Sequence, residues 1–138
     1  MRAPHFVRLA QIDEHRFISA CRHGLVHLTW GRVTLRFRRD EFRQMAEMLT
    51  EIIRHAPPVT RRVGVLSISR QFGGDWELRV GPMALHLESE VGEAFALTAQ
   101  EAVRQLDEVL ASGMWDRQEE EEPPASFEDR LHISFSSN

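Results

Sequence analysis

Residues 15–37 read HRFISACRHGLVHLTWGRVTLRF, and residues 65–87, which lie 50 positions further along the chain, read VLSISRQFGGDWELRVGPMALHL. Identity between the two stretches is low, but apolar residues and glycines recur in both at the same spacing. The shared glycines are Gly24 with Gly74 and Gly31 with Gly81. A fixed period of this length is typical of an internal repeat, so the spacing predicts two copies of one structural unit.

Each stretch contains the pattern of a β-hairpin. Apolar and more polar residues alternate over 26–30 and 33–37, and the same alternation recurs over 76–80 and 83–87. Alternation with a period of two indicates strands that bury one face. Two residues separate the strands each time, and the first is a glycine, which suits a type II′ turn because that position needs a positive φ. These turns are Gly31-Arg32 and Gly81-Pro82.

A helix is expected after each hairpin. Apolar residues recur at helical spacing from Phe42 to Ile53, and Asp40 is placed to cap the N-terminus of that helix. The second helix is expected to begin at Thr98, where Thr98 and Glu101 have the spacing of a capping box. Further strands are expected ahead of the hairpins, over 15–21, 62–71 and 5–11.

These elements predict an α+β protein made of two βββα units. One antiparallel sheet with both helices packed on one face is the simplest way to bury both apolar sets. The chain has 138 residues, enough for a genuine hydrophobic core. We expect a single domain over 1–115, with repeats over about 5–56 and 59–115. The sequence leaves open whether the units share a continuous sheet or form a closed, barrel-like one.

Composition points to a soluble cytoplasmic protein of bacterial type. The formal net charge is −4, which disfavours a strongly basic nucleic-acid-binding protein. All 17 basic residues are arginine, a bias that favours a GC-rich genome. The single cysteine cannot form an intramolecular disulfide, which fits a reducing compartment. No stretch approaches the roughly 18 apolar residues of a membrane span, so no membrane partner is expected.

The C-terminal segment differs from the rest of the chain. Residues 116–130 include four consecutive glutamates followed by two prolines, the composition of an acidic linker. Residues 131–138 then alternate apolar and polar side chains, which predicts a strand that docks on an edge of its own sheet or of a partner's sheet. A frayed terminus is the alternative. The candidate partner-binding residues are Leu131, Ile133 and Phe135.

The chain's only cysteine lies close to two histidines, and Cys21, His23 and His27 are candidate metal ligands. One thiolate and two imidazoles suit zinc, and a Cys–His pair is the minimum for a nucleophilic thiol. The repeat does not require these residue types, since their counterparts are Gln71, Gly73 and Glu77. The spacing nevertheless lacks the separated ligand pairs of a zinc signature, and a lone cysteine is commonly a small buried hydrophobe. No cofactor is therefore the first expectation, and zinc is the alternative.

No catalytic motif accompanies this architecture, since phosphate-binding loops, dinucleotide fingerprints and recognisable paired carboxylates are missing from the sequence. We expect an accessory or interaction protein without catalytic activity, whose partner is another protein or a second copy. One alternative is a zinc-binding or hydrolytic protein that uses the three candidate ligands. Another is a nucleic-acid-binding regulator that uses arginines at the hairpin-to-helix corners, although no exposed aromatic residues are expected among them. These arginines are Arg36, Arg38, Arg39, Arg43, Arg61, Arg62 and Arg70.

Overall fold

The computed structural model describes residues 4–115 and 131–133, and within them four strands followed by one helix occur twice. The first set is β1 (Phe6–Asp13), β2 (Arg16–Cys21), β3 (Leu25–Trp30), β4 (Val33–Arg38) and α1 (Arg39–Ile53). The second set is β5 (Val59–Val63), β6 (Leu66–Arg70), β7 (Trp76–Val80), β8 (Met83–Leu87) and α2 (Ser89–Ala111), and β9 (Leu131–Ile133) follows. The α+β class is confirmed, and each unit has four strands where three were expected.

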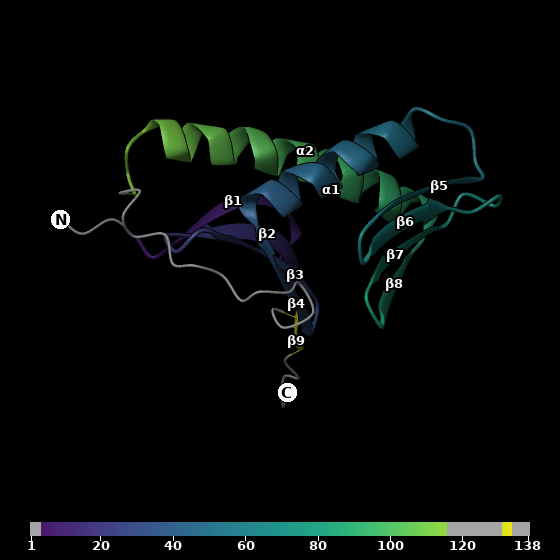
Figure 1. The fold of residues 1–138 in the computed structure, drawn as a ribbon, viewed down its shortest axis with the longest axis horizontal. Helices are drawn as coiled ribbons and strands as arrows, with labels where there is room; N and C mark the ends of the chain where they lie inside the picture. Colours follow the sequence, from purple (N-terminus) through teal and green to yellow (C-terminus); the bar gives the residue numbers. More distant parts are fainter. Residues whose placement is uncertain (1–3, 116–130, 134–138) are drawn as a thin grey trace.

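The strands form two antiparallel sheets, so the prediction of one antiparallel sheet is wrong. Sheet A has the order β1-β2-β3-β4-β9, and sheet B has the order β5-β6-β7-β8 (Figure 1). The reason lies in the connection between them. α1 has 15 residues, and at 1.5 Å per residue it carries the chain about 22 Å, several times the spacing of neighbouring strands. β5 follows this helix and pairs with β6, whereas the edge of β4 is paired with β9.

The two helices pack against each other and bridge the two sheets. α1 contacts β3 and β4 of sheet A and also β5 and β6 of sheet B. α2 lies mainly on β1 and β2 of sheet A, with a smaller contact to β8 of sheet B. In Figure 1 the helices run side by side above both sheets. Because each helix contacts both sheets, the buried apolar side chains of the two units belong to one core.

The helix N-termini differ from those expected. α2 begins at Ser89 and not at Thr98, whose hydroxyl donates a hydrogen bond of 2.7 Å to the Ala94 carbonyl within the helix. The residues before Thr98 continue the helical spacing of buried side chains, with Phe95 fully inside the core, so the helix extends through them. α1 begins at Arg39, and Asp40 lies in its first turn.

The expected strand over 62–71 is a hairpin of β5 and β6 with Gly64 in its turn. Elsewhere the local turns match at the offset of 50. The Gly31 N–H donates to the His15 carbonyl at 2.7 Å, and the Gly81 N–H donates to the Val65 carbonyl at 3.0 Å. Both glycines have a positive φ, and both hairpin turns have two residues, as predicted.

Candidate binding face on sheet A

Sheet A has one face against the helices and one face away from them. Alternate side chains of β2, β3 and β4 are buried in the core, among them Ile18, Leu28 and Leu35, each only 1% exposed. Strand register places the intervening side chains on the opposite face, which we name face A. Its residues are Phe6, Arg8, Gln11, Phe17, Ser19, Cys21, Leu25, His27, Thr29, Thr34, Arg36 and Arg38. None of these residues is acidic.

An irregularity in β1 brings basic and polar groups together on face A. The register of β1 against β2 shifts between Arg8 and Ala10, so that Arg8 and Gln11 both lie on face A. The Arg8 guanidinium donates to the Gln11 side-chain carbonyl at 3.1 Å. Its Cζ atom lies 3.9 Å from the centroid of the Phe17 ring, within the range of a cation–π contact. Arg8 is therefore held over an aromatic ring, and none of the described face A residues in β1–β4 is acidic.

A second group of rings lies at the beginning of β1. Phe6 is 52% exposed, and its ring centroid lies 5.2 Å from that of His27. The His5 ring lies 4.7 Å from the Phe6 ring and 4.9 Å from the His23 ring. Face A thus combines arginines with the rings of Phe6 and Phe17, around Arg8, which was not among the arginines singled out from the sequence. The bulges in β1 interrupt its alternation, which is why sequence reasoning missed Phe6 and Arg8.

His27 is neutral at physiological pH. Burial, with smaller contributions from Arg36 and His5, lowers the pKa of His27 to about 4. Its Nε2 atom is buried and has no hydrogen-bond partner in the part of the chain that the structure describes. The positive charge of face A at neutral pH therefore comes from its arginines.

The three candidate metal ligands are not brought together as a metal site. Cys21 ends β2 and is 4% exposed, His23 lies in the turn after it, and His27 lies on β3. Among residues 4–115 and 131–133, no group of three or more histidine, cysteine, aspartate or glutamate side chains is arranged to hold a metal ion. His23 and His27 contact other rings instead, those of His5 and Phe6 respectively.

The predicted C-terminal strand lies on its own sheet. In β9, Leu131 is paired with Leu35 and Ile133 with Val33, antiparallel to β4. The third candidate partner-binding residue, Phe135, lies outside the described residues. The edge of β4 is therefore occupied by the chain's own C-terminal segment.

Charge is distributed unevenly along the chain. Residues 1–56 hold ten arginines and six carboxylates, whereas residues 57–115 hold five arginines and eight carboxylates. Residues 116–138 hold two arginines and seven carboxylates. The whole-chain charge of −4 thus conceals a basic first unit, which contains face A.

Comparison with protein-family models, with curated proteins and with solved structures found no match to this chain. Neither helix within the described residues is long and apolar enough to span a membrane.

Proposed function

We propose that the protein binds single-stranded nucleic acid through face A and catalyses no reaction of its own. The observation that carries this proposal is the Arg8 guanidinium lying 3.9 Å from the centroid of the Phe17 ring, on a sheet face whose residues in β1–β4 include no carboxylate. Arginine supplies positive charge for phosphates, and aromatic rings supply surfaces on which bases stack. Both groups are therefore present on the same face of sheet A.

A single strand suits face A better than a duplex does. Base–aromatic stacking contributes about 1–3 kcal/mol per base, but it needs bases that are free of a stacked duplex. Phe6, which is half exposed, and Phe17 are the two rings available for it. Duplex readout would need an element that enters a groove, such as a protruding helix, whereas α1 and α2 pack on the opposite face of the sheet.

The proposal retains the expectation of a non-catalytic protein and changes the class of partner. Interaction with another protein was the first expectation because the repeat architecture accounts for the chain, no catalytic motif is present, and an acidic segment leads to a possible C-terminal strand. Arg8 lies over Phe17, and Arg36 lies on the same face. These groups suit contacts with phosphates and bases, which is why the proposed partner is a nucleic acid and not a protein.

The test is fluorescence anisotropy of a labelled DNA strand of about 16 nucleotides. This length is the upper end of the site size of known single-strand-binding domains of the OB-fold type. We expect the full chain to bind this strand more tightly than the corresponding duplex. The double variant Arg8→Gln/Arg36→Gln should lose about tenfold in affinity, and its plot of log affinity against log salt should be shallower by about 0.7 per arginine. Arg62→Gln/Arg79→Gln, which removes two charges from sheet B, is the matched control and should bind as the parent does.

Two outcomes would reject the proposal. The first is no binding at low salt, or equal affinity for the single strand and the duplex. The second is an equal loss of affinity in Arg62→Gln/Arg79→Gln and in the face A variant, which would assign binding to total charge and not to face A.

A further inference from the structure

The two units differ at one pair of equivalent sheet edges. β4 begins at Val33 and β8 begins at Met83, 50 positions later, and each is the last strand before its helix. β9 pairs with β4 through Val33, Thr34 and Leu35. Among the described residues, β8 has β7 as its only strand partner. In Figure 1 β9 lies below β4, whereas β8 is the lowest labelled strand of its sheet.

The missing strand leaves a cross-strand row of apolar residues incomplete. In sheet A, register aligns four positions in one row: Ile18, Leu28, Leu35 and Leu131. In sheet B the corresponding row has only three: Ile68, Leu78 and Leu85. The third positions of the two rows differ in burial, since Leu35 is 1% exposed and Leu85 is only half-buried. Sheet B therefore has the apolar residue Leu85 on its edge strand, whereas in sheet A the strand β9 lies next to the equivalent residue, Leu35.

The other sheet edges carry features that oppose strand addition. β1 has two register irregularities. β5 has the adjacent arginines Arg61 and Arg62, and β9 is only three residues long. β8 has none of these features, because its sequence is MALHL and its pairing with β7 is regular. β8 is thus the one unprotected edge in the described part of the two sheets.

We propose that β8 pairs antiparallel with β8 of a second copy of this chain, about a two-fold axis at Leu85. Each Leu85 then completes the apolar row of the other copy. The same register places Ala84 opposite His86 and Met83 opposite Leu87, so no like charges face each other at neutral pH. Self-pairing of β5 in the same way would place arginines against one another, which is unfavourable. The result is an isologous dimer with one continuous sheet formed from both copies of sheet B.

The test is sedimentation equilibrium of the full chain over a range of micromolar concentrations. We expect a species of twice the chain mass of 16.0 kDa that dissociates on dilution. Ala84→Lys places an ammonium group next to the proposed axis, opposite His86 of the other copy, and should raise the dimer dissociation constant about tenfold or more. The matched control is Thr60→Lys on the exposed β5 edge, which adds the same charge and should leave the dissociation constant unchanged. Circular dichroism establishes that both variants are folded.

Hydrogen exchange on the unmodified protein makes the test independent of any variant. Amides of residues 83–87 should exchange faster on dilution to the monomer, and amides of sheet A should not change. The proposal would be overturned if the chain were a monomer at all concentrations, or if Ala84→Lys dimerised as tightly as the parent. It would also be overturned if the amides that exchange more slowly in the dimer lay only in sheet A or β9. The proposal does not depend on nucleic-acid binding, because face A lies on the other sheet.

Discussion

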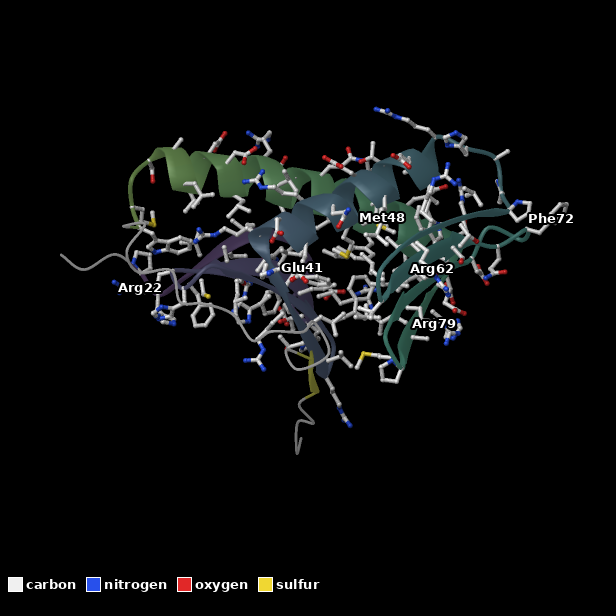
Figure 2. The ribbon with its side chains drawn as sticks, viewed as in Figure 1. Arg22, Glu41, Met48, Arg62, Phe72 and Arg79 are labelled. Atoms are coloured by element: carbon white, nitrogen blue, oxygen red, sulfur yellow. The ribbon has the colours of Figure 1, made fainter. Side chains whose placement is uncertain are left out.

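Face A and the outer face of sheet B occupy equivalent positions and differ in chemistry. Fifty positions after Phe17 and His27 stand Ser67 and Glu77. Glu77 accepts a hydrogen bond of 2.8 Å from Arg79 and lies 3.6 Å from the His86 ring nitrogen. Arg79 points outward from sheet B (Figure 2), but its charge is compensated there by Glu77. The outward positions of the two units thus differ in charge and aromatic content, although the hairpins and turns of the two units are alike.

The inward positions differ in another way. The large and the small side chain of one buried pair are swapped between the strand and the helix. In the first unit Val26 lies on β3 and Phe42 on α1, and both are fully buried. Their counterparts at the offset of 50 are Trp76 on β7 and Gly92 on α2. A Cβ atom at Gly92 would lie 2.2 Å from Cδ1 of Trp76. The large side chain therefore comes from the helix in one unit and from the strand in the other.

The largest expected effect tests this exchange. Gly92→Ala should lower the free energy of unfolding by about 2–3 kcal/mol, because the added methyl group overlaps the Trp76 ring. In a Trp76→Val background the same change should be neutral or stabilising by up to about 1 kcal/mol, since alanine favours the helix. Urea denaturation of the four proteins of this cycle measures the coupling.

Gly73→Ala is the matched control for Gly92→Ala. A Cβ atom at Gly73 meets nothing within 4 Å, so this variant should lie within about 0.5 kcal/mol of the parent. If Gly92→Ala destabilised the parent and the Trp76→Val variant equally, the Trp76 ring would not be the reason that position 92 requires glycine.

The next effect concerns the aromatic component of face A. Phe17→Ser installs the residue of the equivalent sheet B position and should reduce affinity for the single strand about tenfold, because a stacking surface is lost. Phe72→Ser is the control. Phe72 is 83% exposed and lies at the tip of the β6–β7 turn, at the opposite end of the molecule from Arg22 (Figure 2). Equal losses in both variants, measured by anisotropy, would refute the role of face A.

The pH dependence of stability should distinguish His27 from its counterpart Glu77. The pKa of His27 is lowered from 6.5 to about 4, so the unfolded chain binds the proton more readily than the folded chain between these values. Stability is fully present above pH 6.5 and falls as the pH drops toward 4. We expect this contribution to be about 1–2 kcal/mol, after a discount for the ring's remaining contact with solvent.

Urea denaturation of His27→Gln between pH 7 and pH 4 checks this contribution. The variant should show a flatter dependence of unfolding free energy on pH than the parent, because glutamine does not titrate. Identical pH dependence in both proteins would show that His27 does not carry it.

The smallest effect tests the uneven distribution of charge. Replacing the four glutamates at 119–122 by glutamine changes the formal net charge from −4 to zero. Affinity for the single strand should rise about two- to fivefold at low salt, because long-range repulsion of the polyanion decreases. The gain should disappear at high salt, where screening removes it. If the gain in affinity persisted at high salt, long-range electrostatic repulsion would not be its cause.

Sequence reasoning was most accurate where neighbouring residues act on one another. The alternation in 26–30 and 33–37, with Gly31 between them, was sufficient to predict β3, β4 and their turn. It failed at the start of α2, because Thr98 and Glu101 have capping spacing but lie inside a longer helix. It also read 62–71 as one strand, although Gly64 with its positive φ divides the segment into two.

The composition of the candidate site was harder to predict than the hairpins. His27 and Arg36 were visible as outward residues of the first hairpin. Arg8 and Gln11 share that face only because a register shift in β1 changes which side chains point outward. A lone cysteine near two histidines suggested a metal site, whereas the fold places rings of His5 and Phe6 against the two histidines.

The sequence by itself determined the two hairpins, the residues of their turns and the apolar stripe of each helix. These features depend on backbone preferences and on side chains a few positions apart. Only the tertiary structure decided that the strands form two sheets, that β9 covers β4 while β8 has no such cover among the described residues, and that Arg8 lies over Phe17. Those outcomes depend on where α1 delivers the chain and on contacts between residues far apart in sequence.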